Sequence, residues 1–386
     1  MEKKPNPQSA GMKLPVGISN FEELITEGYL YVDKTRYIEL LEDESNPYQL
    51  FIRPRKFGKS LFFTTLSCYY DRNYADRFDT LFKQLYIGTH PTPKHNSFVM
   101  LKFDFSGLNT ASAENFEVSF YGRIRKSLLD FMRTYHSLFP NTDAEMDIMT
   151  RSVQSIEDLL TLYSLVTTAK AKLFVIIDEY DHFANDLIAL GKIGDDVYHR
   201  MVNANGLVRD FYETLKIGTK SVVTRIFLTG ISPMMMNDLT SGFNIASNLT
   251  LALDYNEMMG FTSEEVDALI DTALIDRTLI TKENIDLERY YNGYLFNKNA
   301  DTRVYNPTMA LYCLHQIKRT KKPPEQLFDN NVRTDYARLR GLAQNDQNRK
   351  TLIKIMKEDA ITAEIQSSFS IDEMYHEKYF VSLLFY

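Results

Sequence analysis

The chain alternates short apolar runs with longer segments of helical spacing. The apolar runs cover residues 48–52, 98–105, 173–178 and 224–230. Their length and their content of β-branched and aromatic residues predict strands, and the run at 173–178 has no polar residue before its end. Such a run is typical of a central parallel strand that is buried on both faces. Helical spacing is found near residues 59–70, 113–138, 155–170 and 195–216.

This order of strands and helices predicts the fold class. Strands that alternate with helices favour a parallel sheet with right-handed crossovers, so we expect a three-layer α/β domain with a central parallel sheet. Short helices are predicted before it, near 20–25 with Ser19 or Asn20 as N-cap, and through residue 41. Beyond about residue 255 the spacing becomes mainly helical. A capping box, in which Thr262 or Ser263 precedes Glu265, predicts the start of a helix there.

The turn after the first strand carries the most specific chemistry. Residues 53–60 read Arg-Pro-Arg-Lys-Phe-Gly-Lys-Ser between a predicted strand and a predicted helix, which is the layout of a P-loop. Backbone N–H groups and the helix dipole would hold phosphate oxygens, Lys59 would reach the outer phosphates and Ser60 would bind Mg²⁺. The loop departs from the consensus because Arg53 stands where its first glycine is expected.

The run at 173–178 ends in two acids, Asp178 and Glu179. Carboxylates at the carboxyl end of a central strand lie where open α/β sheets bind ligands. This is the Walker B pattern, in which Asp178 would hold Mg²⁺ and Glu179 would orient and polarise the attacking water. Gly-Lys-Ser alone is common, and a strand that ends in two acids is often only a solvated strand end. The two patterns together, in this order, favour a nucleoside-triphosphate site.

Thr229, at the end of the fourth predicted strand, has two interpretations. It lies where a sensor residue would contact the γ-phosphate or the attacking water. The alternative is that its hydroxyl only caps the turn, and the sequence does not separate the two.

Composition and charge narrow the class of protein. The chain has 386 residues, of which 44% are hydrophobic and 25% charged, so it can form one large core or several smaller ones. A net charge of −7 argues against a surface that coats nucleic acid broadly. Cys68 and Cys313 lie far apart in helical segments, which favours two buried free thiols. Without a signal peptide or an apolar run of membrane-spanning length, we expect a cytoplasmic protein with no membrane partner.

With these motifs in hand, the sequence resembles the bacterial AAA-ATPase-like family. Members of that family are often fused to a C-terminal PD-(D/E)XK nuclease-like domain. The resemblance spans roughly residues 13 to 310 and rests on specific segments. These are residues 14–21, 31–35, 53–61, 177–181, 227–232, 260–262, 291–294 and 304–307.

The resemblance changes the interpretation of the loop. Arginines at positions 53 and 55 are normal in the family, and one or both are expected to contact phosphate or a neighbouring carboxylate. The resemblance also implies ATP as the nucleotide. The cofactor-binding residues are then expected to be Arg53, Arg55, Lys56, Phe57, Gly58, Lys59, Ser60 and Leu61, with Lys59, Glu179 and Thr229 as catalytic residues.

Two further roles remain open at the level of sequence. Asp181 belongs to the Walker B segment, where it would position a basic residue or water, or act only as a supporting carboxylate. An arginine finger would come from Arg225, from Arg209 or from another copy of the chain in a homo-oligomer.

The resemblance also implies a division of the chain. We expect a disordered segment at 1–12, the ATPase domain at 13–255, a helical lid at 256–370, and the start of a truncated or missing nuclease-like domain at 371–386. The expected function is Mg²⁺-dependent ATP binding and hydrolysis that regulates or powers an associated nuclease-like domain or partner. Nucleic acid would be bound only through that missing domain. The alternative is a nucleotide-gated switch with little turnover.

Overall fold

A computed structural model gives the fold of most of the chain. The described residues are 12–152, 155–189, 192–203, 205–235, 237–238, 243–282, 286–322, 324–326, 336–358 and 361–386. The predicted disordered segment, 1–12, lies outside the described residues except for Met12.

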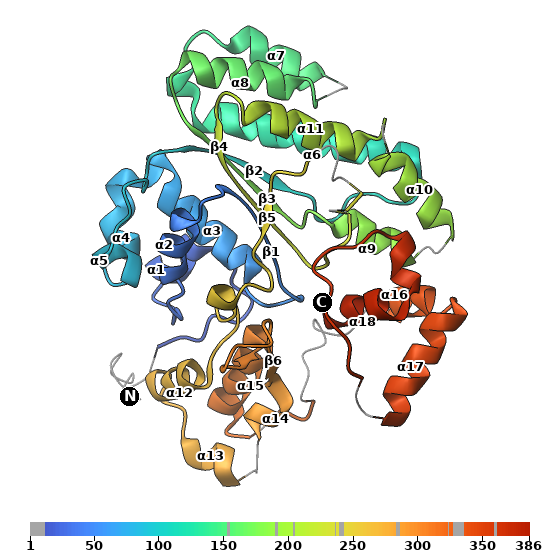
Figure 1. Ribbon diagram of the computed structural model, residues 1–386. Helices are drawn as coiled ribbons and strands as arrows, with labels where there is room; N and C mark the ends of the chain where they lie inside the picture. The colour runs from blue at the N-terminus through green and yellow to red at the C-terminus, as the bar shows by residue number, and fades with distance from the viewer. Residues whose placement is uncertain are drawn as a thin grey trace, which may run out of the picture.

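A five-stranded sheet forms the centre of the molecule (Figure 1). All of its strands are parallel, in the order β2-β3-β4-β1-β5. Their bounds are β1 Tyr48–Ile52, β2 Val99–Asp104, β3 Leu173–Asp178, β4 Val223–Gly230 and β5 Ser247–Asn248. The four strands predicted from apolar runs are confirmed, whereas β5, with two residues, is too short to leave a sequence pattern.

Successive side chains of each strand enter two different cores. In β3, Val175 and Ile177 pack with the helices on one face, while Phe174 and Ile176 pack with those on the other. The first face is covered mainly by α6 Ala113–Thr134, α8 Asp158–Thr168, α9 His182–Ala189, α10 Lys192–Val202 and α11 Leu207–Gly218. The second is covered by α1 Phe21–Thr26, α2 Arg36–Asp43, α3 Lys59–Tyr70, α4 Phe78–Phe82 and α5 Tyr86–Thr89. The predicted three-layer α/β fold is confirmed.

The single helix predicted near 195–216 is wrong, because the structure divides it into α10 and α11. The break falls at Gly206, whose N–H donates to the carbonyl of Asn203. A Cβ at Gly206 would lie 2.2 Å from the carbonyl oxygen of Met201, so this tight turn requires glycine.

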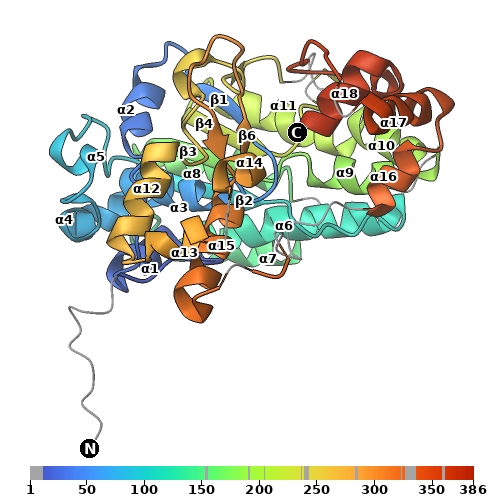
Figure 2. The same ribbon diagram turned by 90° about the horizontal axis from the view of Figure 1, so that it is seen from below.

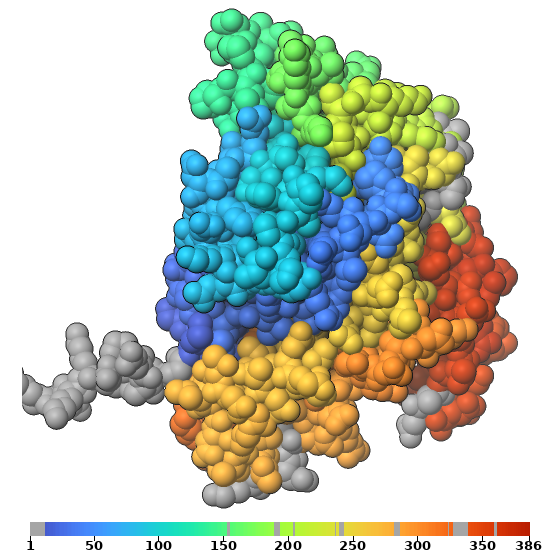
Figure 3. All heavy atoms as spheres, turned by 60° about the vertical axis from the view of Figure 1, so that its left-hand side comes forward, coloured from blue at the N-terminus to red at the C-terminus, as the bar shows by residue number. Residues whose placement is uncertain are grey.

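A mainly helical unit follows the sheet and lies beside the end of β1. It contains α12 Ser263–Thr272, α13 Arg277–Lys282, α14 Leu287–Tyr291 and α15 Pro307–Thr320. It also contains a small antiparallel pair, β6 Asn292–Tyr294 and β7 Val304–Tyr305, that the sequence did not predict. The predicted capping box is confirmed, with Thr262 as N-cap and Glu265 as its partner. Figure 3 shows this yellow-orange unit directly against the blue N-terminal part.

The last part of the chain packs elsewhere. Helices α16 Tyr336–Leu342, α17 Asp346–Glu358 and α18 Glu377–Phe385 lie near α9 and α10, away from α12 and α15 (Figures 1 and 2). Phe369, Phe380 and Leu383 belong to the same hydrophobic core as the sheet. The structure therefore divides the region predicted as one helical unit, 256–370, into two parts. The boundary at 370/371 stays a prediction.

Two simpler expectations can be compared with the structure. Cys68 and Cys313 are both buried and free, as predicted. Within the described residues, no helix has the length and apolar character that a membrane span needs.

Candidate functional site

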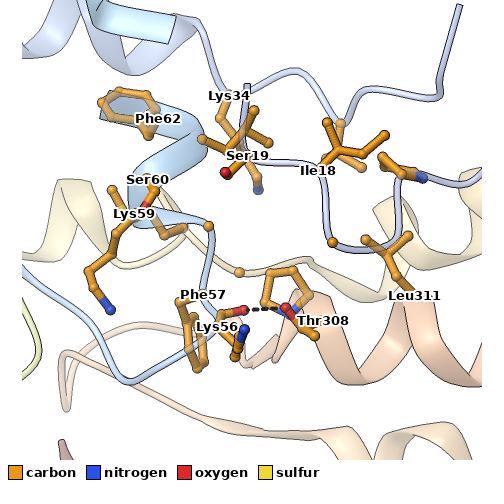
Figure 4. A pocket seen from close by; sticks show the side chains of 18 of the residues that line it. Ile18, Ser19, Lys34, Lys56, Phe57, Lys59, Ser60, Phe62, Thr308 and Leu311 are labelled. Carbon is orange, nitrogen blue, oxygen red and sulfur yellow. Dashed lines mark hydrogen bonds between the residues drawn. The ribbon is translucent and has the colours of Figure 1, made fainter. Parts of the chain in front are cut away.

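A cavity of about 630 Å³ opens at the carboxyl end of β1. Its polar wall holds Lys59, Ser60, Glu179 and His182. Its apolar wall comes from segments far apart in the sequence, namely Val16, Ile18, Val32, Phe261, Leu269 and Leu311. Figure 4 shows Ile18 and Leu311 on one side of the cavity and the P-loop residues on the other. The volume lies within the range usual for small-molecule sites, and the cavity has one polar and one apolar end.

The P-loop runs from the end of β1 to the start of α3 and has two left-handed residues. Lys56 has a φ of 67° and Gly58 a φ of 90°. Gly58 is the N-cap of α3, so the loop turns directly into the first helical N–H groups. Glycine adopts this backbone conformation without a steric penalty, which explains Gly58. The turn therefore presents a helix N-terminus to the polar end of the cavity.

Lys59 is held inside the loop that precedes it. Its Nζ donates to the carbonyl oxygen of Arg53 at 2.8 Å and to that of Pro54 at 2.9 Å. Burial lowers the pKa of Lys59 to about 8, although the charges of Asp178, Asp181 and Glu179 act in the opposite direction. Lys59 lines the cavity together with Glu179, which follows β3.

Ser60 lines the polar end of the cavity, and Asp178, which is not among the described lining residues, contacts Ser60. The hydroxyl of Ser60 donates to Oδ2 of Asp178 at 2.8 Å, across 118 positions of sequence. Burial raises the pKa of Asp178 to about 6, and the bond from Ser60 acts against this rise. A hydroxyl and a carboxylate are hard oxygen ligands of the kind that Mg²⁺ prefers, so the donor set fits this ion.

Glu179 occupies a strained turn directly after β3. Its backbone is left-handed, with a φ of 51°, which is uncommon for a residue other than glycine. Oε2 of its carboxylate lies 3.0 Å from Nδ1 of His182, and Nε2 of His182 lies 3.3 Å from Oδ2 of Asp186. The bond with His182 lowers the pKa of Glu179, and the same bond raises the pKa of His182. Glu179 is thus a carboxylate in its charged form at neutral pH.

Asp181 lies deeper and joins two strand ends. Its carboxylate accepts hydrogen bonds from the backbone N–H of Ile231 at 3.0 Å and of Ser232 at 2.6 Å, and from Nδ2 of Asn185 at 2.7 Å. A Cβ at Gly230 would lie 2.2 Å from Oδ1 of Asp181, so this close approach requires glycine. Of the two roles left open by the sequence, the contacts favour the supporting carboxylate.

Arg53 does not face the cavity with its side chain. The guanidinium is fully buried and donates to the backbone carbonyls of Thr250 at 2.8 Å and Tyr255 at 2.7 Å. It also lies between the rings of Phe51 and Phe296, at 4.1 and 3.7 Å from their centroids. Burial lowers the pKa of Arg53 to about 9, so it remains charged at neutral pH. The sequence predicted that this guanidinium contacts phosphate or a carboxylate. In the structure its partners are instead backbone carbonyls and aromatic rings.

The middle of the loop is exposed and attached to the helical unit. Arg55 and Lys56 are exposed and line the cavity. Their carbonyls accept hydrogen bonds from Nδ2 of Asn306 at 3.2 Å and from the hydroxyl of Thr308 at 3.0 Å (Figure 4 draws the second). Phe57 is buried with its ring 4.7 Å from that of Tyr294. Leu61 also lines the cavity.

Thr229 is buried within the sheet. Its hydroxyl donates to the carbonyl oxygen of Phe51 in the neighbouring strand at 2.9 Å. Among the described residues that line the cavity, Thr229 is absent, whereas Ile231, two positions later, is present. The arrangement favours a hydroxyl that joins β4 to β1 over one that contacts a phosphate.

The two arginines considered as fingers lie away from the cavity lining. Nη2 of Arg225 donates to the carbonyl of Leu41 at 2.6 Å, near the start of β4. Arg209 pairs with Glu213 on α11 at 2.9 Å. Neither arginine is among the described lining residues.

Two cavity residues, Lys34 and His182, had no role predicted from the sequence, yet each contacts an acidic residue. Lys34 forms an ion pair with Glu265 at 2.6 Å, which joins the N-terminal segment to α12, and burial lowers the pKa of this lysine. His182 contacts Glu179, as described above. Lys34 lies in one of the segments that carry the resemblance, which was the available signal, whereas no pattern pointed to His182.

Two known proteins can be compared with this chain. The first is a protein of Azotobacter chroococcum mcd 1 described as "Uncharacterized protein in vnfD 5'region". It is 27% identical over 319 residues, which are 81% of this chain and 53% of that relative. The chain thus spans about half of the length of this relative. The second is the Walker-type ATPase paby2304 of Pyrococcus abyssi, with a TM-score of 0.38 and 11% identity over 90% of this chain and 79% of that one.

The family comparison covers the region of the P-loop and the sheet. The family model described as "Predicted AAA-ATPase" matches residues 15–240, which is more than half of the chain and includes both acids of β3. On this match, the chain belongs to the predicted AAA-ATPase (AAA-ATPase-like) family.

Proposed function

We propose that this chain binds ATP with Mg²⁺ in the cavity at the end of β1 and hydrolyses it. The observation that carries the proposal is the 2.8 Å bond between Ser60 and Asp178, which joins the P-loop to the acidic end of β3. Lys59 and Glu179 lie at the same end of the cavity. Membership of a family described as predicted AAA-ATPases supports the same activity.

The two ends of the cavity suit the two ends of a nucleotide. The N–H groups at the start of α3 and the charges of Lys59 and Arg55 would bind the phosphates. The apolar wall formed by Val16, Ile18 and Leu311 would receive the base, since such surface gains by leaving water. Adenine rather than guanine is proposed from the family alone.

The residues of the polar end would share the work of phosphoryl transfer to water. Lys59 would exchange its bonds to loop carbonyls for bonds to the outer phosphates. Ser60 and Asp178 would hold Mg²⁺, which supplies positive charge against the phosphate oxygens. Glu179 would accept a hydrogen bond from the attacking water and orient it. Catalysis would come from position and charge, as is general for this reaction.

We also propose that turnover serves an associated domain or partner. The relative from A. chroococcum extends over about twice the matched length, which supports a role for the module within a larger protein. A nuclease-like domain, and nucleic acid as its substrate, remain predictions from the resemblance.

A nucleotide-gated switch is the second candidate function. The specific observation in its favour is that the cavity wall combines N-terminal segments, among them Lys34, with α12 and α15. The ion pair of Lys34 with Glu265 links this N-terminal part to α12. A nucleotide held between these segments could change their separation. In that case a single-turnover experiment should show tight ATP binding, and phosphate release should be far slower than the activity of the domain or partner that the nucleotide controls.

The proposal is tested by nucleotide binding and phosphate release with Mg²⁺. Lys59→Ala should lower ATP affinity at least 100-fold, because it removes a charge-assisted contact to the phosphates, worth about 3 kcal/mol. Glu179→Gln should keep the affinity and lose turnover. Lys126→Ala, on the exposed face of α6, is the control and should change neither. Hydrolysis by Glu179→Gln at the wild-type rate would show that the assigned base is wrong.

A further inference from the structure

We infer that His182 is a positioning residue for Glu179, which holds the carboxylate in the orientation needed to receive the attacking water. The inference rests on the proposed ATP hydrolysis and adds a residue to it. His182 is the first residue of α9 and lines the same cavity as Glu179. Its two ring nitrogens contact two acids, Glu179 at 3.0 Å and Asp186 at 3.3 Å.

Hydrogen bonds hold the backbone of the turn that carries Glu179, but they do not fix its side chain. The backbone N–H of His182 donates to the carbonyl of Glu179 at 3.1 Å, which closes the turn. The N–H of Tyr180 donates to the carbonyl of Thr229 at 3.1 Å, and Asp181 is anchored by the N–H groups after β4. The side chain of Glu179 is 29% exposed, so without a partner it could adopt several rotamers. The imidazole of His182 removes that freedom.

Competing charges make such a restraint necessary. Lys59 and Arg55 line the same cavity as Glu179. A carboxylate drawn into an ion pair with either cation would no longer be available to water. The contact from Nδ1 of His182 comes from α9, an element other than the P-loop.

Asp186 completes the arrangement. It is one helical turn after His182 on α9, and its Oδ2 faces Nε2 of the imidazole. Glu179 and Asp186 contact His182, and the negative charge of Asp181 also raises the pKa of this histidine. A ring held between two carboxylates keeps its orientation, as in other sites where a third group orients the group next to the reacting base. Asp186 therefore orients His182, and His182 orients Glu179; the proposed role of the three residues is positioning and not proton transfer.

The test separates kcat from substrate affinity. His182→Ala should lower kcat of ATP hydrolysis about 10-fold or more, with KM and ATP affinity within about threefold of wild type. His182→Asn keeps a donor near the position of Nδ1 and should recover a substantial part of kcat. Glu179→Gln combined with His182→Ala should be no slower than Glu179→Gln alone, because the orienting residue acts only through the carboxylate.

The matched control is His199→Ala. His199 lies on the neighbouring helix α10 and pairs through Nε2 with Asp372 at 3.2 Å, so it is also a carboxylate-paired histidine, outside the cavity lining. It should leave kcat unchanged. A second readout needs no nucleotide: Glu179→Gln should shift the NMR-detected pKa of His182 downwards, since the bond with Glu179 is the largest cause of its raised value.

Each outcome decides between the two claims. If Glu179→Gln abolishes hydrolysis while His182→Ala keeps a kcat within twofold of wild type, the inference fails and the proposed function stands. An equal loss in His199→Ala, or a loss of ATP affinity that parallels the loss of kcat, also overturns the inference. If the wild-type chain binds no ATP, the proposed function itself fails.

Discussion

The two ends of the P-loop both carry a buried cation that donates to main-chain carbonyls, but only Lys59, at the second end, lines the cavity. At the first end, Arg53 is buried and donates to main-chain carbonyls such as that of Thr250. At the second end, Lys59 and Ser60 line the cavity next to the acids of β3. The first end fixes the loop against the rest of the protein, and the second presents groups to a ligand. A loop that lacks its first glycine can therefore keep the shape of a phosphate-binding turn, because the buried side chain of Arg53 anchors the start of the loop to the backbone of Thr250 and Tyr255.

The end of β3 repeats this contrast. Asp178 accepts a hydrogen bond from the cavity residue Ser60, whereas Asp181, three positions later, accepts hydrogen bonds from the backbone after β4. In both motifs one charged residue is placed for a ligand and another of the same sign holds the framework. Neither the type of residue nor its burial distinguishes the two roles, because all four side chains are buried. The place of the partner does: Lys59 and Asp178 contact the P-loop, whereas Arg53 and Asp181 contact the backbone of later segments.

The largest effect should come from restoring the consensus glycine. Arg53→Gly should lower the free energy of unfolding by about 4 kcal/mol, because it leaves buried carbonyls of Thr250 and Tyr255 without a donor and a cavity beside Phe296. Urea unfolding measures this change. Arg55→Gly, the same substitution at an exposed arginine of the same loop, should change it by less than about 1 kcal/mol.

Nucleotide affinity sharpens this first test. Arg55→Gly should weaken ATP binding in a salt-dependent manner, because Arg55 lines the cavity. If Arg53→Gly were as stable as the wild type and bound ATP more tightly, the loop would not need Arg53 to keep its shape. The contrast between the two ends of the loop would then disappear.

These contrasts show what the sequence could predict. The strands were predictable because their apolar runs are continuous, and Lys59, Ser60 and Asp178 were predicted to lie together because strand ends meet at one edge of a parallel sheet. The direction of Arg53 was not predictable. Its acceptors lie about 200 positions further on, in a turn at Thr250 and at the end of the short 3₁₀ helix Leu253–Tyr255, which are too short to leave a periodic pattern.

Histidine and short strands escaped prediction for other physical reasons. A single histidine near an acid carries no spacing signal, so the contact of His182 with Glu179 emerges only from the turn between β3 and α9. Strands β5, β6 and β7 have two or three residues each, fewer than one period-2 pattern needs. The break at Gly206 depends on a close approach of backbone atoms, which the helical spacing on both sides conceals.

A smaller effect is expected from the framework acid of β3. Asp181→Asn should lower the free energy of unfolding by about 2 kcal/mol, because one amide N–H₂ must then face the N–H groups of Ile231 or Ser232. Asp178→Asn is the matched control. It should leave stability unchanged or slightly increased, since burial already disfavours the charged form of Asp178, and it should lose Mg²⁺-dependent turnover. Equal stability losses in the two variants would contradict the division into ligand-facing and framework acids.

The smallest effect tests whether the helical unit supports the ligand-facing half of the loop. Thr308→Val keeps the shape of the side chain and removes the 3.0 Å bond to the carbonyl of Lys56, which lies in the left-handed part of the loop. A neutral hydrogen bond contributes about 1 kcal/mol, and part of this should appear as a loss of ATP affinity of about threefold, measured by titration calorimetry. Thr320→Val, at the other end of α15, loses a comparable bond to the carbonyl of Gln316 and is the control. If both variants bind ATP like the wild type, the loop keeps its shape through Arg53 and α3 alone, and the contact with α15 only joins two packed units.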